Sequence, residues 1–456
     1  MFLEVVRSEG LGHLSYIFGD GGQAAVVDPR RDCDVYLDIA YREGARVTHV
    51  FETHRNEDYV IGSMDLASRT DATILHGNAL PFGYGEEVNE GETFELGDIR
   101  LTVLETPGHT MESISLALTD TGFSDEPIAV FTGDALFIGD VGRTDFYPDR
   151  AKAVAGLLYD SIFEKILPLG DHVILYPAHG AGSVCGSGMA SREFSTLGYE
   201  RKHNPVLQLT DRNAFVEHKV SEHHYQPPYF SKMETLNLEG PPLLGTVPKP
   251  RPLNTEEFAT HLAAGVIAVD IRSPEAIAGA HIPGSLAIPC EMLPAFAGWY
   301  LPYGGSVALV AAGYGDAQFA VCHLARLGYD NVVGFLDEGL HAWEVSGRDY
   351  DTIAVLHAKE LKSRIESSEP FVLLDVRARD EVEAARLPDC THIYVGELPE
   401  RLDHIPSDRP ITTFCGSGQR AMVAASILKR HELADVEVCL GSMAACRAIG
   451  CAIETG

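Results

Sequence analysis

Four strand-like runs in the first half of the chain each end in a residue that can bind a metal ion. They are VTHVFETH (47–54), RLTVLETPGH (100–109), PIAVFTGD (127–134) and HVILYPAH (172–179). In layered α/β folds the carboxyl ends of strands meet at one edge of the sheet, where ligands and metals bind. One histidine at a strand end is usually structural, but four successive strand ends of this kind indicate a metal site.

The length of the chain predicts more than one domain. A chain of 456 residues is long enough for about three domains of about 150 residues each. The stretch LEGPPLLGTVPKPRP (238–252) is dense in proline and glycine, so it is expected to be an extended linker. We expect a metal-binding domain over 1–235, a linker over 236–252, and two smaller domains over 253–350 and 354–456.

The region after the linker contains a weak internal repeat. An apolar strand that ends in Asp-x-Arg occurs as VIAVDIR (266–272) and, about 105 residues later, as FVLLDVR (371–377). Each copy continues with a second strand, a loop and a helix. This period is too long for a solenoid and predicts two copies of a small α/β domain, each with a parallel sheet and crossover helices.

Charge and cysteine usage limit the partners and the compartment. The formal charge is -31, which argues against a nucleic-acid or anionic-membrane partner because both require a basic face. Glu4 and Arg7 interrupt what would be the apolar core of a signal peptide, and no apolar run approaches ~18 residues, so no membrane segment is expected. Nine cysteines without CxxC spacing are typical of reduced thiols, and we expect a cytoplasmic protein.

One cysteine in the second copy lies at the start of a helix. The strand PITTF (410–414) leads into Cys415-Gly-Ser-Gly-Gln-Arg420, and the alanine-rich spacing that follows is helical. Backbone N–H groups and the helix dipole are expected to stabilise a thiolate and bind an anion, with Arg420 adding a fixed charge. The sequence thus predicts that Cys415 is a nucleophile that accepts sulfur from an anionic donor. The turn residues expected to bind substrate are Gly416, Ser417, Gly418 and Gln419.

This loop resembles that of the rhodanese family of sulfurtransferases, in which a cysteine is followed by a glycine-containing turn and an arginine. The resemblance covers about residues 354–456 and includes the strand end Asp375-Val-Arg377. It departs from the family at RLPDCTHIYV, where the usual His-Ile-Pro-Gly segment is missing. The resemblance implies a sulfurtransferase domain with Cys415 as its active cysteine and Arg420 as its catalytic arginine.

The first copy resembles the same family in its framework but not in its loop. It keeps the segment His281-Ile-Pro283-Gly284 and ends with GFLDEGLHAW (334–343). Its loop reads Ala311-Ala-Gly-Tyr-Gly-Asp316, with alanine in place of the nucleophile and aspartate in place of the arginine. We expect residues 253–350 to be a catalytically inactive rhodanese-like domain.

Residues 1 to about 235 resemble the metallo-β-lactamase fold, and within it the branch of persulfide dioxygenases and their rhodanese fusions. The motifs that carry the resemblance are FTGDAL (131–136), GRTDF (142–146), YPAHG (176–180) and PPYFSKM (227–233). The resemblance implies an αββα sandwich. The expected fold class is therefore α/β, a metallo-β-lactamase sandwich followed by two rhodanese-like domains with parallel sheets.

The metal signature of that fold is His-x-His-x-Asp-His, which supplies ligands to two adjacent ions. In this chain the segment is His54-Arg-Asn56-Glu-Asp58-Tyr59, so two of the three histidines are replaced. A binuclear thioester hydrolase of the glyoxalase II type needs both ions to hold its bridging hydroxide, and the ligand count disfavours it. What survives is a set of two histidines and one carboxylate: His54, His109 and Asp134.

Such a triad leaves three coordination positions open and suits non-haem Fe(II), which binds substrate and O₂ together. We expect one Fe(II) per chain, with zinc as the alternative. By resemblance, Asn56, Asp58 and His179 are remnants of the second metal site that lie around the ion.

Three further residues are expected to contact the substrate. Tyr59 is positioned to donate a hydrogen bond to bound oxygen or substrate. Arg143 and Thr144, in a loop that resembles the family's thiol-substrate loop, are expected to hold a substrate carboxylate. The sequence does not identify the thiol that carries the substrate sulfur.

The leading hypothesis is a persulfide dioxygenase that oxidises a low-molecular-weight thiol persulfide with O₂ to sulfite and thiol. Cys415 would then exchange sulfane sulfur among persulfide, sulfite and thiosulfate. The alternatives are a sulfurtransferase with a catalytically silent N-terminal domain, a glyoxalase II type hydrolase with rhodanese appendages, and a non-enzymatic sulfur carrier. The direction of transfer and the oligomeric state, including a homo-oligomer, stay open.

Overall fold

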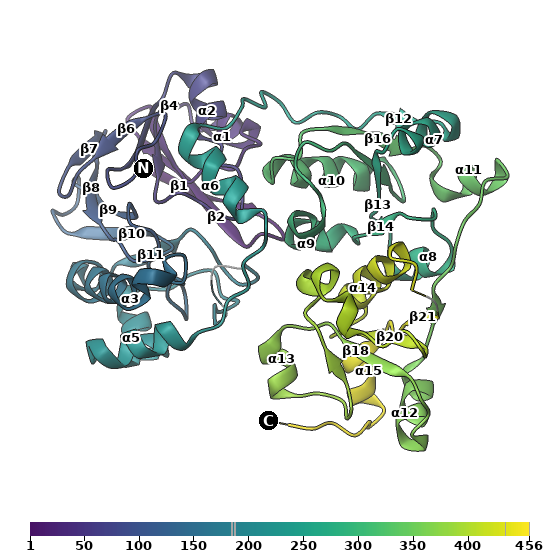
Figure 1. Ribbon diagram of the computed structural model, residues 1–456. Coiled ribbons are helices and arrows are strands. Elements are labelled where there is room, and N and C mark those ends of the chain that lie inside the picture. The colour runs from purple at the N-terminus through teal and green to yellow at the C-terminus, as the bar shows by residue number, and fades with distance from the viewer. Residues whose placement is uncertain (184–185, 187, 434, 456) are drawn as a thin grey trace. The chain divides into compact units, whose positions relative to one another are not determined.

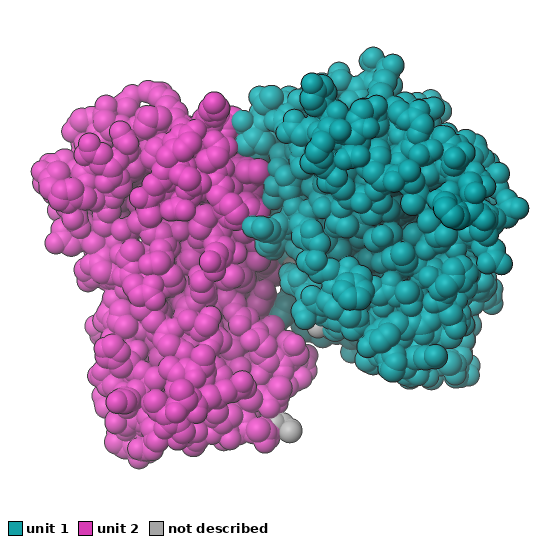
Figure 2. Space-filling model, turned by 180° about the vertical axis from the view of Figure 1, so that it is seen from behind, with its two compact units in different colours: residues 1–247, 325–328 teal, residues 248–324, 329–456 magenta. Residues whose placement is uncertain are grey.

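The computed structural model describes residues 1–183, 186, 188–433 and 435–455. The chain forms two compact units, Met1–Val247 with Ala325–Gly328 and Pro248–Leu324 with Tyr329–Gly456 (Figure 2). Within the described ranges no helix is long and apolar enough to cross a bilayer. Each unit is described separately below.

Two mixed sheets make up the first unit (Figure 1). The first sheet has the order β1 (Phe2–Ser8), β2 (His13–Asp20), β3 (Gln23–Val27), β4 (Arg46–Glu52), β5 (Thr73–Gly77), β6 (Glu86–Val88). The second has the order β11 (Ile174–Pro177), β10 (Pro127–Gly133), β9 (Ile114–Asp120), β8 (Ile99–Glu105), β7 (Thr93–Leu96). The expected hairpin around GDGG is β2 and β3, which pair antiparallel with Asp20 opposite Gln23.

The apolar faces of the two sheets pack against each other and the outer faces are covered by helices. Phe18 of β2 stacks on Phe131 of β10, with ring centroids 5.0 Å apart, in the core between the sheets. The helices α1 (Asp34–Arg42) and α2 (Ser63–Thr70) contribute to the core outside the first sheet. The helices α3 (Ala151–Asp160) and α5 (Arg212–Ser221) contribute to the core outside the second. The expected αββα sandwich is confirmed.

This architecture brings the strand ends together. In the second sheet β8 and β10 both run antiparallel to β9, and β11 is parallel to β10, so the carboxyl ends of β8, β10 and β11 lie at one edge. The loop after β4 of the first sheet reaches the same edge. A Cβ at Gly133, whose φ is 52°, would lie 2.6 Å from the Thr53 hydroxyl, so the close approach of these two loops requires glycine.

Helix α6 (Phe230–Glu239) fixes the loop that contains His54. The buried side chain of Asn237 donates to the backbone oxygens of Asn56 at 2.7 Å and Tyr59 at 2.8 Å, and it accepts from the Ile61 N–H at 3.0 Å. The helix ends at Glu239, so it extends past residue 235, after which the linker was expected to begin. The reason is that Asn237, in its last turn, packs against the loop after β4.

The second unit contains two parallel sheets with the same strand order. They are β12 (Pro252–Leu253), β16 (Val332–Leu336), β15 (Val307–Val310), β13 (Ile267–Asp270), β14 (Leu286–Ala287), and β17 (Ala354–Val355), β21 (Val436–Val438), β20 (Ile411–Phe414), β18 (Val372–Asp375), β19 (Thr391–His392). The strand ends of the repeat carry matching ion pairs, Arg272 to Asp270 at 2.5 Å and Arg377 to Asp375 at 2.6 Å. The expected pair of parallel-sheet domains is confirmed.

Short helices connect these strands. In the first copy they are α7 (Thr255–Ala263), α8 (Pro274–Gly279), α9 (Leu293–Tyr300), α10 (Tyr314–Arg326) and α11 (Gly339–Val345). In the second copy they are α12 (Ala358–Ser367), α13 (Arg379–Ala384), α14 (Gln419–Arg430) and α15 (Ser442–Ala448). Helix α14 also contacts the first copy: its Ser426 hydroxyl accepts from the Ala287 N–H at 3.0 Å, and Arg430 donates to the Gly284 oxygen at 2.7 Å.

Glu52, at the end of β4, has a buried carboxyl group two residues before His54. The Tyr84 hydroxyl lies 2.9 Å from Glu52 Oε2 and also 2.9 Å from the backbone oxygen of Asn237. One hydroxyl proton cannot serve both acceptors, so a protonated Glu52 that donates to the tyrosine oxygen satisfies the whole group. Burial raises the pKa of Glu52 to about 8.

The first unit is therefore expected to lose stability as the pH rises through the pKa of Glu52, because the folded state binds a proton that the unfolded state releases at about pH 4.3. The stabilisation from this proton is complete below the pKa of Glu52 in the unfolded chain, and about 2 kcal/mol of the free energy of unfolding is lost between about pH 6 and 8. Glu52→Gln, which mimics the protonated form, should remove this part of the pH dependence. Denaturant unfolding at both pH values measures it, with the exposed Glu95→Gln as control. An unchanged slope in Glu52→Gln would contradict this assignment.

Candidate metal centre and thiol loop

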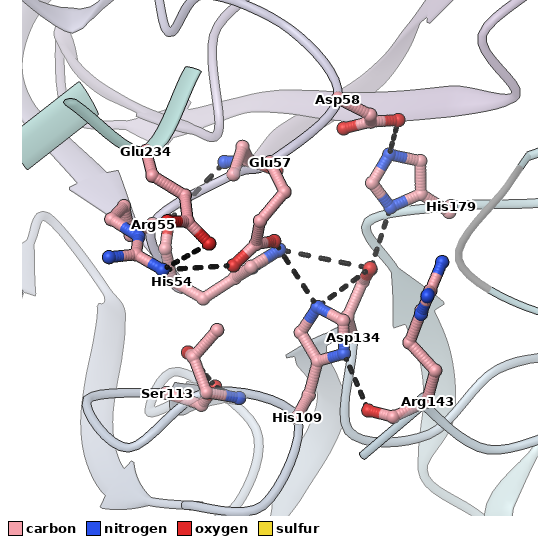
Figure 3. Close-up of polar contacts among 12 residues, drawn as sticks. His54, Arg55, Glu57, Asp58, His109, Ser113, Asp134, Arg143, His179 and Glu234 are labelled. Atoms are coloured by element: carbon pink, nitrogen blue, oxygen red, sulfur yellow. Dashed lines mark hydrogen bonds and ion pairs between the residues drawn. The ribbon is translucent and has the colours of Figure 1, made fainter. Parts of the chain in front are cut away.

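Three of the residues predicted as metal ligands from the strand ends lie together at the edge of the sandwich (Figure 3). One donor atom each from His54, His109 and Asp134 lies within 4.8 Å of the others. Asp134 Oδ2 is 3.7 Å from His54 Nε2 and 3.5 Å from His109 Nε2. All three side chains are buried, so the cluster is shielded from bulk water.

These residues fit a divalent metal ion. In the described part of the chain, His54 Nε2, His109 Nε2 and Asp134 Oδ2 are buried and have no hydrogen-bond partner. A buried polar atom without a partner costs free energy, and three such atoms that point at one another are best explained by a shared ligand. Two imidazoles and a carboxylate are donors that iron and zinc both accept.

Hydrogen bonds behind the histidines fix which ring nitrogen faces the centre. The Thr53 hydroxyl donates to Asp28 at 2.6 Å, so it can accept from His54 Nδ1, which lies at 2.9 Å. His109 Nδ1 donates to the Arg143 backbone oxygen at 3.0 Å. In both rings Nε2 is left with its lone pair toward the centre, the arrangement that a metal ligand requires.

Electrostatics favour an ionised carboxylate next to these rings. Burial lowers the pKa of His54 to about 4, so this ring is neutral. Burial also opposes the charged form of His109, but the carboxylates of Glu57 and Asp134 outweigh it and raise the pKa of that ring. Although burial opposes its charge, His179, whose Nδ1 lies 2.7 Å from Oδ1, holds the pKa of Asp134 well below its usual range.

Glu57 lies in the same cluster, although the sequence interpretation assigned it no role. Its Oε2 is 3.6 Å from His109 Nε2, and its Oε1 is 3.5 Å from the Arg55 guanidinium. Arg55 also pairs with Glu234 at 3.1 Å (Figure 3). Burial raises the pKa of Glu57, but His109, His54 and Arg55 outweigh it and hold the pKa below its ordinary value. The cluster therefore contains a second ionised carboxylate.

Asp58 and His179, which the family resemblance implies are remnants of a second metal site, contact each other next to Asp134. His179 Nδ1 donates to Asp134 Oδ1 at 2.7 Å, and His179 Nε2 lies 3.1 Å from Asp58 Oδ2 (Figure 3). Against the cost of burial, these two carboxylates raise the pKa of His179 well above its ordinary value. A protonated His179 would place a positive charge between Asp58 and Asp134.

The remaining residues of the altered signature also lie inside the domain. The Asn56 amide donates to the His54 backbone oxygen at 3.3 Å, within its own loop. The Tyr59 ring lies against that of His13, with centroids 4.0 Å apart and planes tilted by 32°, and its buried hydroxyl has no hydrogen-bond partner in the described chain. The Tyr59 hydroxyl is thus able to donate to a bound molecule, and its expected role stays a prediction.

The expected substrate loop lies beside the centre, but its arginine is already paired. Arg143 is buried, forms two hydrogen bonds to Asp145 at 2.7 and 2.6 Å and donates to the Tyr225 oxygen at 3.1 Å. Thr144 is buried next to it. A cavity of about 600 Å³ is lined by Asp145, Phe146, Phe230 and Glu234 among others. Recognition of a substrate carboxylate by Arg143 would have to compete with Asp145, and that role stays a prediction.

The cysteine loop begins directly after β20. Cys415 is buried, its Sγ accepts from the Gly418 N–H at 3.1 Å, and its own N–H donates to the Ser442 hydroxyl at 3.0 Å. Gly418 precedes α14 with φ of 102°, and a Cβ there would lie 2.1 Å from the Leu440 oxygen. Only glycine fits this turn, which places Cys415 at the N-terminus of the helix.

Side chains around the loop are acidic as well as basic. Arg420 forms a bidentate pair with Glu381 at 2.5 and 2.9 Å. Gln419 donates to Glu291 of the first copy at 3.3 Å, while Ser417 is exposed and a Cβ at Gly416 would lie 3.3 Å from the Arg420 guanidinium. The charge of Arg420 is therefore largely compensated by Glu381.

Known families match separate parts of the chain. The metallo-beta-lactamase superfamily matches residues 9–179, and the rhodanese-like domain matches residues 254–346 and 357–448. The chain is 29% identical over 204 residues to "Persulfide dioxygenase ETHE1, mitochondrial" of Bos taurus, which covers 43% of this chain and 72% of the relative. It is 28% identical over 216 residues to "Hydroxyacylglutathione hydrolase GloC" of Haemophilus influenzae, covering 42% and 91%.

A solved metallo-beta-lactamase from Staphylococcus aureus subsp. aureus COL matches over a longer span. It is 31% identical, covers 74% of this chain and 98% of that chain, and gives a TM-score of 0.66. The chain belongs to the metallo-beta-lactamase superfamily. Its metallo-beta-lactamase domain has persulfide dioxygenase homologues and is followed by two rhodanese-like domains, as the sequence resemblance implied.

The first rhodanese-like domain has the framework of the second but a different loop. Ala311 follows β15 at the place where Cys415 follows β20, and Asp316 stands within α10 where Arg420 stands within α14. Cys322 lies further along α10. The inactive state expected for this domain stays a prediction based on these replacements.

Within the metallo-beta-lactamase domain, sequence reasoning missed Glu57 because the family signature leaves this position variable. The available signal was indirect: a second acidic residue stands directly before Asp58 in a segment that has lost two histidines. The sequence does not say whether the Glu57 side chain points toward the candidate metal ligands or away from them. In the structure it points toward His109.

We expect the metallo-beta-lactamase domain to bind one divalent ion per chain, because His179 already connects Asp58 and Asp134. Titration of the metal-free protein with Zn²⁺ or Co²⁺ should saturate at one equivalent. Asp58→Asn should keep that equivalent, whereas Asp134→Asn should lose it. Two tightly bound equivalents in the unaltered protein would contradict the single centre.

Proposed function

We propose that this protein is a persulfide dioxygenase whose product is linked to sulfane-sulfur transfer by its second rhodanese-like domain. The observation that carries the proposal is the buried set of His54, His109 and Asp134, whose inward donor atoms have no hydrogen-bond partner in the described chain. Support comes from the persulfide dioxygenase homologues of this domain and from its covalent link to a rhodanese-like domain with a cysteine loop.

The proposed reaction converts thiol persulfide, O₂ and water into thiol and sulfite. Fe(II) bound by His54, His109 and Asp134 would supply the redox chemistry. The chain's own contribution is to hold the two imidazoles in one tautomer through Thr53 and Arg143, and to exclude water by burial. The cavity lined by Asp145, Phe146 and Glu234 has room for a thiol carrier next to the centre.

The proposed transfer step takes place at Cys415. Its thiolate attacks the terminal sulfur of a persulfide R–S–SH, the donor S–S bond breaks, and the thiol leaves with the electron pair and takes a proton. The product is a cysteine persulfide on Cys415. Sulfite then attacks its outer sulfur, so that thiosulfate leaves and the thiolate is restored. The Gly418 N–H, 3.1 Å from Sγ, is placed to stabilise negative charge there.

A thioester hydrolase is the second candidate, since one relative is named a hydroxyacylglutathione hydrolase. That reaction in this fold uses a hydroxide between two ions. The contacts of His179 with Asp58 and Asp134 oppose a second ion, so we place this candidate below the dioxygenase. A silent metal domain remains the alternative that the next experiment tests.

The decisive measurement is anaerobic purification, quantification of bound iron and zinc, and O₂ uptake with glutathione persulfide. We expect about one iron per chain and O₂ uptake that depends on the persulfide, with sulfite as product. No uptake from iron-loaded protein would overturn the dioxygenase proposal. Hydrolysis of a thioester substrate without O₂ uptake would support the second candidate.

The two centres are expected to be separable by mutation. Cys415→Ser should abolish sulfur transfer to cyanide or sulfite, because Cys439, Cys446 and Cys451 of the same domain lie outside the glycine turn, and should leave O₂ uptake in place. His109→Ala should reduce the rate of O₂ uptake by more than about 100-fold and leave the rate of sulfur transfer unchanged. Cys439→Ser, a buried cysteine of the same domain, is the control for transfer. Transfer that persists in Cys415→Ser would show that the nucleophile is misassigned.

Glu381 is expected to limit the use of thiosulfate as a donor, because it compensates the charge of Arg420. Glu381→Gln should raise kcat/KM for thiosulfate by about 10-fold, the effect of one charge-assisted contact of about 1.5 kcal/mol. The rate with a thiol persulfide should change less. Glu383→Gln on the same helix, where Glu383 pairs with Arg379, is the matched control. Equal effects on both donors would contradict a role in selection against anions.

A further inference from the structure

Glu57 is the least explained charge in the metallo-beta-lactamase domain. Its carboxylate is buried, and neither oxygen has a hydrogen-bond partner in the described chain. A buried carboxyl group whose two oxygens both lack a hydrogen-bond partner is unfavourable, which indicates a ligand that the protein itself does not supply. The Arg55 guanidinium is 3.5 Å from Oε1 but only 3.1 Å from Glu234, so it is shared between two acids.

The other oxygen of Glu57 faces the proposed metal centre. Oε2 lies 3.6 Å from His109 Nε2, and that nitrogen is in turn 3.5 Å from Asp134 Oδ2 (Figure 3). A distance of 3.6 Å is too long for a hydrogen bond. Two donors that bind one ion at about 2.1 Å lie at most about 4.2 Å apart, and both contacts of His109 meet this limit. Glu57 is not one of the three residues whose donor atoms all lie within 4.8 Å of one another, so ligation requires its carboxylate to move toward the ion.

We propose that Glu57 is a fourth protein ligand of the metal, which makes the centre a set of two histidines and two carboxylates. This inference rests on the proposed function, since it requires an ion at His54, His109 and Asp134. Position 57 is adjacent to the lost ligand position of Asn56, whose amide bonds to its own loop. The donor lost at 56 is replaced by a carboxylate that enters from the next residue.

A fourth ligand changes what the centre can do. Two carboxylates and two neutral imidazoles balance the charge of a divalent ion. A six-coordinate ion would keep two positions open, enough for one persulfide and one O₂, instead of three. A four-coordinate zinc ion would be fully enclosed by protein, as in structural zinc sites. With Glu57 as a ligand, the coordination number of the bound metal therefore decides whether the centre has positions open for substrate.

The test is metal binding, measured separately from turnover. Metal-free wild type, Glu57→Gln and Glu57→Asp are titrated with Co²⁺ in competition with a chelator, and the d–d absorption spectrum is recorded at saturation. We expect both variants to lose about 100-fold in affinity and to show a changed Co²⁺ spectrum. Glu57→Asp keeps the charge near Arg55 but shortens the side chain, so it separates ligation from charge compensation.

Glu234→Gln is the matched control, because Glu234 shares Arg55 with Glu57 but does not face His109. It should bind Co²⁺ within about threefold of wild type, with the same spectrum. Thermal unfolding of the metal-free variants checks that they are folded. Wild-type affinity and spectrum in both Glu57 variants would overturn the inference and leave the proposed function intact. Failure of the wild-type protein to bind Co²⁺ or iron would overturn the proposed function and this inference with it.

Discussion

The arrangement of the candidate metal centre depends on Asp134, whose two carboxylate oxygens face different partners. Oδ1 accepts from His179, and Oδ2 is thereby directed toward His54 and His109. His179 also contacts Asp58, and against the cost of burial the two carboxylates raise the pKa of this histidine well above its ordinary value. A protonated His179 between Asp58 and Asp134 is the feature on which the expectation of a single ion rests.

The parts of the first unit that lie far from the centre in sequence serve this arrangement. Asn237 of α6 holds the backbone on both sides of Asp58, and Thr53 relays a hydrogen bond from His54 to Asp28. These contacts satisfy the groups behind the ligands and leave the inward atoms unsatisfied. Buried polar atoms are normally paired, so a group of unpartnered atoms gathered around His54, His109 and Asp134, which includes the oxygens of Glu57 and Asp58, is typical of a binding site.

The two rhodanese-like domains share one framework but differ in the loops that follow β15 and β20. Both keep the strand order and the Asp-x-Arg ion pair at the end of the first long strand. The first domain retains the segment around Gly284 that the second has lost, and it uses this segment to bind α14 of the second domain through Arg430. Glu291 of the first domain also reaches Gln419 in the cysteine loop. The first domain, which has Ala311 where the second has Cys415, thus contributes Glu291 to the surroundings of its neighbour's cysteine loop.

Local sequence determined the elements and most of the ligand types. Strand-end histidines, the glycine turn at Cys415 and the repeated Asp-x-Arg strands are set within a few residues, so periodicity and turn chemistry predict them. Only the tertiary structure decided the partners of the charges. Nothing near Glu57 or Arg420 in the sequence says that they face His109 and Glu381. The reason is physical: a charged side chain acts through the few ångströms around it, and in a buried site those neighbours come from loops that the fold, and not the chain order, brings together.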